Sequence, residues 1–390
     1  MRQPMVSVII PVYNGSDFLT EAVDSILQQT YSNYEIIVVN DGSDDNGKTR
    51  DVALAYGNRI RYIEKENGGV ASALNDGIRI MRGSYFAWLS HDDTFCSTKI
   101  ESQMEAIFSS GNEMTICAGN YCLCDENLAQ CITTDFQKHF PMSYLKQPLF
   151  LLLWGELHFS SLLFHRKHFE RVGLFDESLL TAQDNDFIFR LMRGQKITFV
   201  ETSVSRVRLH SLSGTSQYHK LVDTENCKLY ASMIKDLSDE EIQRIAPKPY
   251  MVYGKIGGLL KSMGGEKELS LVEKQAEERG AEWSDLKERT CLKERPMAIF
   301  GAGEYGLRLK YELNLRQIEP VCFLDNNPEK AGTVIDGIPC YEISHLKEHS
   351  EYMAVIAQKF YASAWEQLQR IGHSHVMLKQ EVDSLLLQEA

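Results

Sequence analysis

Four short apolar segments, separated by helical patterns, constrain the fold of the first hundred residues most strongly. The apolar segments are residues 6–11, 34–39, 60–63 and 85–89. The helical patterns between them cover residues 16–28, with Ser16 as the expected N-cap, then 50–55 and 70–81. Strands that alternate with helices predict a parallel sheet with right-handed crossovers. The chain is therefore expected to be an α/β protein.

Polar residues stand at the end of each predicted strand. They are, in chain order, Tyr13 and Asn14 two and three residues after Pro11, then Asp41, then Asn67 and Gly68, then Asp92 and Asp93. The carboxyl ends of parallel strands meet at one edge of the sheet, where open α/β folds bind ligands. A carboxylate pair there suits a hard divalent cation, which keeps substrate phosphates as further partners. The pattern predicts the metal and diphosphate end of a nucleotide-sugar site.

Charge and cysteine content narrow the class of protein further. With 390 residues, 43% of them hydrophobic, the chain can form two or three domains. Its formal net charge of −13 argues against a nucleic-acid partner. The odd number of cysteines, nine, with no secretory signal, predicts reduced thiols and a cytoplasmic protein. No apolar run reaches the length of a membrane span, and residues 148–154 are expected in the core.

The rest of the chain changes character twice. Residues 100–215 are mixed, with a turn at 173–177, a helix starting at Asp184, and strands at 197–200 and 204–209. Residues 218–294 are charged and helical and are expected to form a connector. A second α/β pattern follows, so we predict three parts: a first domain over 1–217, a helical connector over 218–294, and a small Rossmann-like domain over 295–390.

The last part contains a Gly-x-Gly-x-x-Gly turn between a strand and a helix. Its glycines are Gly301, Gly303 and Gly306, and Asp325 follows at the distance expected for a ribose-binding acid. This pattern allows a second nucleotide site, with a nucleotide or NAD(P) as its cofactor. A scaffold or interaction role is the alternative, because no partners for hydride transfer accompany the motif.

Motifs along residues 5–216 together resemble the family 2 glycosyltransferases, which have the GT-A fold. The matching stretches are residues 8–14, 38–43, 67–69 with Asn75 and Gly77, 89–93, 172–177, Gln183-Asp184, and Arg208 with His210. The resemblance implies an inverting transferase that moves a sugar from a nucleotide diphosphate, with UDP expected, to an acceptor hydroxyl.

The resemblance also implies a role for each matching residue. Asp184 would be the general base, and Asp93 with His210 would ligate Mg²⁺ or Mn²⁺. Asp41 would accept a hydrogen bond from the nucleobase, and Asp92 would contact ribose or metal. The remaining expected contacts to the nucleotide sugar are Pro11, Tyr13, Asn14, Asn67, Gly68 and Arg208.

The chemistry of sugar transfer supports these roles for a divalent cation and a single carboxylate base. A divalent cation stabilises the negative charge that develops on a departing diphosphate. A single carboxylate that deprotonates the acceptor suffices for direct displacement, which inverts the anomeric centre. Two departures from the family pattern stand out: Ser90 replaces an acidic residue, and Gln183 replaces a glutamate, which should leave the pKa of Asp184 lower than a glutamate neighbour would.

Simpler roles remain open for several of these residues. Asp92, Asp93 and Asp184 could cap helices, and His210 could be a solvated loop histidine. Trp154, Glu156 and His158 could line an acceptor pocket or pack in the core.

By analogy, the resemblance also suggests a step in surface-polysaccharide assembly such as O-antigen or capsule. The acceptor would be a lipid-linked saccharide at the inner face of the cytoplasmic membrane, reached by peripheral membrane association. The alternatives are an NAD(P)-dependent enzyme that modifies sugar nucleotides and a non-catalytic nucleotide-sugar-binding protein.

Overall fold

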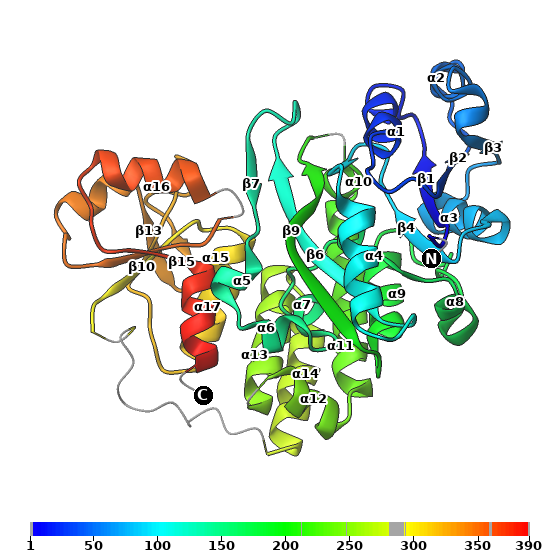
Figure 1. Ribbon diagram of the computed structural model, residues 1–390. Helices are drawn as coiled ribbons and strands as arrows, with labels where there is room; N and C mark the ends of the chain where they lie inside the picture. The colour runs from blue at the N-terminus through cyan, green and yellow to red at the C-terminus, as the bar shows by residue number, and fades with distance from the viewer. Residues whose placement is uncertain are drawn as a thin grey trace. The chain divides into compact units, whose positions relative to one another are not determined.

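The computed structural model describes residues 3–211, 213–246, 248–280, 292, 294–358 and 361–388 (Figure 1). The chain divides into two compact units, Met1–Glu225 and Asn226–Ala390. Among the described segments, no helix combines the length and the hydropathy needed to span a bilayer. Residues 281–291, at the end of the predicted connector, lie outside the described part.

A five-stranded sheet, in the order β3-β2-β1-β4-β8, forms the centre of the first unit. Its strands are β1 (Val6–Val12), β2 (Tyr34–Asn40), β3 (Arg61–Glu64), β4 (Tyr85–Trp88) and β8 (Phe164–His165). The first four run parallel, and β8 pairs antiparallel with β4. All of β1 and β4 is buried, as apolar strands covered on both faces should be. The predicted parallel sheet is confirmed.

Three helices connect these strands: α1 (Leu19–Leu27), α2 (Lys48–Leu54) and α3 (Gly69–Ile80). The prediction of Ser16 as the N-cap of the first helix is wrong. The N-cap is Phe18, without a side-chain cap bond, because the carbonyl of Gly15 accepts from the N–H groups of Phe18 and Leu19. The chain thus turns once more before the helix begins.

A second sheet, in the order β5-β9-β6-β7, packs beside the first within the same unit. Its strands are β5 (Thr94–Phe95), β6 (Ile116–Cys124), β7 (Cys131–Thr133) and β9 (Ile197–Arg208). The two strands expected at 197–200 and 204–209 are one strand. Its register against β6 jumps between Gly119 and Tyr121, so a bulge lies where the sequence suggested a break.

Short helices complete this unit, and α11 continues past its boundary. They are η1 (Gly57–Arg59), α4 (Lys99–Ser109), α5 (Phe136–His139), α6 (Met142–Leu145), α7 (Phe150–Leu153), η2 (Phe159–Ser161), α8 (Lys167–Val172), α9 (Gln183–Met192), α10 (Gly214–Gln217) and α11 (His219–Asp236). The whole of α7 is buried, which confirms a core segment at 148–154. Trp154 is also buried and stacks on Phe150.

The expectation that all cysteines are reduced is wrong for one pair. Cys124 and Cys131 form a disulfide across the β6–β7 hairpin. The antiparallel register places these two residues directly opposite each other, with their Cα atoms 4.1 Å apart. Six other cysteines are free thiols, and Cys291 lies outside the described residues.

The second unit contains a six-stranded sheet, in the order β12-β13-β11-β10-β14-β15, in which only β12 runs antiparallel to its neighbour. Its strands are β10 (Met297–Phe300), β11 (Cys322–Leu324), β12 (Val334–Ile335), β13 (Ile338–Tyr341), β14 (Met353–Ile356) and β15 (Val376–Leu378). Its helices are α12 (Asp239–Ile245), α13 (Pro249–Ser262), α14 (Glu266–Glu278), α15 (Glu304–Asn314), η4 (Ile343–Lys347), α16 (Tyr361–Arg370) and α17 (Lys379–Gln388). Apolar clusters cover both faces of the sheet.

A buried ion cluster ties the helical segment to this sheet's own helices. Asp383 of α17 lies 2.6 Å from Lys255 of α13 and 2.7 Å from Lys379, and Lys255 lies 2.7 Å from Glu312 of α15. Burial raises the pKa of Asp383, but the two lysine charges outweigh burial and lower that pKa to about 2. The helices of 226–280 thus belong to one compact unit with the sheet, and the three-part division with ends at 217 and 294 stays a prediction.

We expect Asp383→Ala to lower the free energy of unfolding of this unit by about 3–5 kcal/mol, because it leaves two lysines without their shared carboxylate. Denaturant titration of the full chain measures the shift of the unit's transition. Glu366→Ala is the matched control, since Glu366 pairs with Arg370 at the surface and such pairs contribute about 0–1 kcal/mol. Equal effects of the two substitutions would contradict a structural role for the cluster.

Candidate functional site

The strand ends of the first sheet meet at one edge, as predicted. Val12 pairs with Asn40, Asn40 with Glu64, and Ile9 with Trp88, so the loops that follow β1 to β4 emerge side by side. The loops after β1 and β4 touch: a Cβ on Gly15 would lie 2.2 Å from the His91 ring. This contact requires glycine and brings residues 13–15 beside the 91–93 segment.

Asp41 is buried at this edge and is held by the loop that follows β3. Its carboxylate accepts hydrogen bonds from Gly68 N–H at 3.0 Å and Gly69 N–H at 2.8 Å, and lies 2.8 Å from Lys65 Nζ. The loop at Asn67-Gly68, which was expected at the same sheet edge, therefore contacts Asp41 directly. Its role as the acceptor for a nucleobase stays a prediction.

The residues after β1 form a second group. Asn14 adopts a left-handed backbone with φ of 49°. Its side chain donates to Asp44 Oδ1 at 2.6 Å and accepts from Asp44 N–H at 2.9 Å. Pro11 is buried, whereas Tyr13 is 43% exposed. These positions are compatible with the predicted base and ribose pocket, which the structure does not test.

The two adjacent aspartates after β4 face different partners. Asp92 Oδ2 lies 3.0 Å from His210 Nε2, whereas Asp93 Oδ1 accepts from the backbone N–H of Arg208 at 2.9 Å. Burial raises the pKa of Asp92, but the hydrogen bond to His210, the charges of His91 and His210 and a backbone hydrogen bond together outweigh burial and hold the pKa below its usual range. The Asp92 carboxylate is an oxygen ligand of the kind that Mg²⁺ or Mn²⁺ accepts, and the imidazole beside it is a ligand more typical of transition metals.

Antiparallel pairing of β5 with β9 creates this arrangement. Thr94 pairs with Arg206, so the residues before Thr94 face those after Arg206.

The described residues contain no group of three or more acidic, histidine or cysteine side chains that could enclose a metal. Asp92 and His210 would thus supply only part of a coordination shell, with the rest left to substrate phosphates and water.

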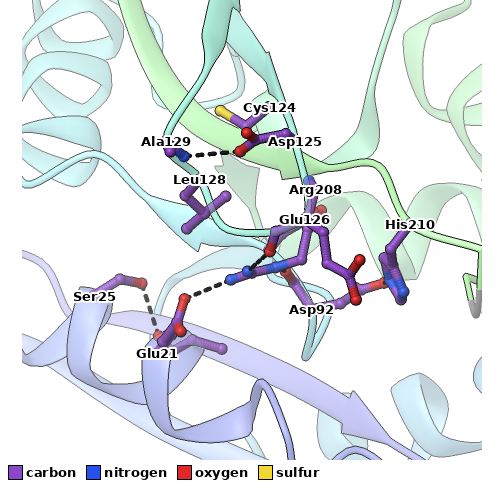
Figure 2. A network of polar contacts seen from close by, with 12 residues as sticks. Glu21, Ser25, Asp92, Cys124, Asp125, Glu126, Leu128, Ala129, Arg208 and His210 are labelled. Carbon is purple, nitrogen blue, oxygen red and sulfur yellow. Dashed lines mark hydrogen bonds and ion pairs between the residues drawn. The ribbon is translucent and has the colours of Figure 1, made fainter.

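Arg208 is buried and binds three segments at once (Figure 2). Its Nε donates to the Asp92 carbonyl at 2.7 Å, and one terminal nitrogen donates to Glu21 of α1 at 2.5 Å. The other donates to the Glu126 carbonyl in the β6–β7 hairpin loop. The guanidinium also lies 4.3 Å from the centroid of the Phe18 ring. With all of these partners, Arg208 holds the Asp92 segment in place, and its expected contact with the nucleotide sugar stays untested.

Asp184 lies in the first turn of α9 and is half-buried. Its carboxylate accepts from the Asn185 N–H at 2.8 Å. Burial dominates and raises the pKa of Asp184 to about 6. A carboxylate with a raised pKa accepts a proton more readily than an ordinary aspartate does, which suits a general base.

Asn75 connects the turn at 173–177 to α3. Its side chain donates to the Phe175 carbonyl at 3.0 Å and accepts from the Phe175 N–H at 3.0 Å. The Phe175 ring in turn stacks on Phe187 of α9, with centroids 4.3 Å apart. The matching motif residues Asn75 and 173–177 therefore act together to place the helix that carries Asp184.

In the Gly-x-Gly-x-x-Gly turn of the second unit, backbone conformation and close packing explain two of the three glycines. Gly301 has a φ of 115°, and a Cβ on Gly306 would lie 1.9 Å from the Gly301 carbonyl oxygen. A Cβ on Gly303 would meet open space. Asp325 accepts from the Ala302 N–H at 2.9 Å and lies 3.3 Å from Lys330 Nζ. Nucleotide or NAD(P) binding here stays a prediction.

Sequence reasoning missed Glu21, Lys65 and Glu225, which hold Arg208, Asp41 and the loop before α9. All three look like ordinary surface charges in the sequence. Only their partners, which lie far away along the chain, single them out, and no local signal could have found them.

Comparison with known proteins gives a consistent result. A family model described as glycosyl transferase family 2 matches residues 7–173. An uncharacterised glycosyltransferase of Rickettsia prowazekii is 39% identical over 262 residues, which cover 67% of this chain and 81% of that protein. One from Rickettsia felis is 44% identical over 249 residues, which cover 64% of this chain and 41% of the relative. The chain thus spans about two fifths of the length of that longer relative.

Two solved structures share the fold of this chain. S. aureus TarS 1–349 in complex with UDP-GlcNAc matches with a TM-score of 0.50 and 14% identity, over 73% of this chain and 94% of TarS. A mannosyltransferase from Pyrobaculum calidifontis, in complex with GDP-Man and Mn²⁺, matches with a TM-score of 0.50 and 18% identity, over 72% and 76%. The first unit therefore has the predicted GT-A architecture.

We expect Arg208→Lys to destabilise the first unit, because an ammonium cannot satisfy Glu21 and the carbonyls of Asp92 and Glu126 in one geometry. The loss should be about 1–3 kcal/mol in total, to be measured by denaturant unfolding of the full chain. Arg79→Lys is the control, since Arg79 is half-exposed and pairs with Asp76 on its own helix. Unchanged stability of the Arg208 variant would show that the network does not hold the segment.

Proposed function

Because this chain belongs to the family 2 glycosyltransferases, we propose that it transfers a sugar from a nucleoside-diphosphate sugar to an acceptor hydroxyl, with inversion. UDP is the expected nucleotide. The observation that carries the proposal is the pairing of Asp92 with His210 beside the loop that follows β1. In this proposal the pair would bind the cation at the sheet edge where nucleotides bind in open α/β folds.

Asp92 and His210 would hold the cation, in place of the Asp93 and His210 pair inferred from the motif. Asp93 is buried and accepts from the Arg208 N–H, so its geometry fits a structural part better than a coordinating one. A bound Mg²⁺ or Mn²⁺ would supply Lewis-acid stabilisation of the leaving diphosphate. Arg208 would keep the Asp92 backbone in position for this task.

Asp184 would take the proton of the acceptor hydroxyl. The carboxylate lies at the start of a helix whose position is fixed by the Phe175–Phe187 stack. One base on the acceptor side, with no carboxylate nucleophile, corresponds to a single displacement and therefore to inversion.

The proposal extends to the biological setting by analogy. The family resemblance supports a role in surface-polysaccharide assembly, with a lipid-linked acceptor at the inner face of the cytoplasmic membrane and peripheral association there. The UDP-GlcNAc in the TarS structure supports a UDP-linked donor.

We expect Asp184→Asn to reduce sugar transfer by about 10²–10⁴-fold, because the amide cannot accept the proton. The donor should still bind, since the substitution lies outside the strand-end loops. Release of UDP from a panel of UDP-sugars measures turnover, and a thermal shift with UDP measures binding. Asp186→Asn, at the same end of α9, is the control, since its side-chain oxygen can still accept from Arg190. Full activity in the Asp184 variant would exclude it as the base.

The pH dependence follows from the raised pKa of Asp184. The base works only when ionised, so kcat/KM should rise with pH up to a pKa of about 6 and level off above it. Below that value the rate should fall roughly tenfold for each pH unit. A profile that stays flat down to pH 4.5, measured with buffers of constant ionic strength, would contradict this assignment.

The metal assignment predicts different effects for two neighbouring residues. Asp92→Asn should abolish the extra thermal stabilisation that Mn²⁺ adds to UDP, because it removes a cation ligand. Asp93→Asn should keep that Mn²⁺ effect, since its side-chain oxygen can still accept from Arg208 N–H. The reverse result would return the cation to Asp93.

A further inference from the structure

In the first turn of the helix that carries Asp184, the Asp184 carboxylate itself accepts from the Asn185 N–H at 2.8 Å, but the described residues that lead into the helix have no such acceptor close by in the chain. The N-cap of α9 is Ala182, which has no side chain that can accept a hydrogen bond. The first N–H groups of a helix need acceptors, and serine, threonine, aspartate or asparagine usually supply one. The acceptor for the segment entering α9 must come from elsewhere in the chain.

Glu225 of α11 supplies it. Its carboxylate accepts from three successive backbone N–H groups, those of Leu180 at 3.1 Å, Thr181 at 2.8 Å and Ala182 at 3.0 Å. The Thr181 hydroxyl donates to the same carboxylate at 2.8 Å. Burial raises the pKa of Glu225, but these hydrogen bonds outweigh burial and lower it, so the group is a carboxylate at neutral pH. A negative charge at this end also suits the helix dipole.

The rest of α9 is fixed independently. Arg190, near its other end, donates to the carbonyls of Val172 at 2.6 Å and Leu174 at 3.1 Å. Phe187 stacks on Phe175 in the aromatic core. Loss of Glu225 would therefore loosen only the first turn, and Asp184 lies two residues after Ala182.

We propose that Glu225 is a positioning residue, which fastens residues 180–182 to α11 and so sets the place of the Asp184 carboxylate. The inference rests on the proposed function, in which Asp184 is the base. Small displacements of a catalytic group reduce turnover strongly without changing how the donor binds. Glu225 touches neither the acceptor nor the donor in this scheme.

The test compares Glu225→Gln with Asp223→Asn in the full chain. Both replace an acid of α11 by its amide, but Asp223 pairs with His219 of its own helix at 2.8 Å. In the Glu225 variant we expect kcat to fall about tenfold or more, with the donor KM within about twofold. Amide exchange at residues 180–182 should accelerate at least about tenfold. The Asp223 variant should match the wild type in both measurements.

Each result is decisive. Unchanged exchange at residues 180–182 would overturn the tether, whatever the activity. Faster exchange with unchanged kcat, or a loss expressed in the donor KM alone, would overturn the positioning role. If the wild type turned over no sugar nucleotide, the proposed function and the positioning role of Glu225 would both fall, while amide exchange would still report the tether.

Should Glu225→Gln not fold, Thr181→Val removes one of the four hydrogen bonds to Glu225, and a smaller change of the same kind in kcat and in amide exchange is expected.

Discussion

The site depends on one buried guanidinium. Arg208 joins α1, the segment after β4 and the β6–β7 hairpin loop, three parts that lie far apart along the chain. A buried cation is costly unless all its donors are used. Here the charge of Glu21, two carbonyls and the Phe18 ring compensate it. The planar fork of arginine fits this set, which a lysine could not reproduce. The β5–β9 pairing brings Asp92 opposite His210, and this junction holds the Asp92 segment there.

The sequence predicted the parallel sheet and its polar edge well, because both arise from local signals. The central strands are runs rich in β-branched residues in β1 and β2 and in aromatic residues in β4, and the end of each strand determines which side chains meet at the edge. The bulge in β9 was not predictable in this way. It depends on the register against β6, where Val200 pairs with Gly119 and Ser203 with Asn120. The Cys124–Cys131 disulfide likewise follows from register in the hairpin and not from cysteine spacing.

The sequence predicted which polar side chains gather at the edge of the sheet, but it could not predict which partner each of them meets. Asp92 and Asp93 are equivalent in the sequence, yet one meets an imidazole and the other a backbone N–H. The neutral neighbour Gln183 suggested a comparatively low pKa for Asp184. Burial of the carboxylate acts in the opposite direction and dominates. Neighbour charges can be read from a sequence, but desolvation depends on packing between segments far apart along it.

The second unit shows why a phosphate-binding fingerprint is weak evidence alone. Gly301 lies in the left-handed region, and Gly306 leaves no room for a Cβ against the Gly301 carbonyl. Asp325 closes the turn by accepting from Ala302. A tight strand-to-helix turn thus requires two of the glycines and uses the acid before any ligand is considered. Gly303, whose Cβ position is open, is the one glycine of the motif that packing does not explain. A substitution of Gly303 is therefore the change in this motif that would report on ligand binding, because Gly301, Gly306 and Asp325 are needed for the fold.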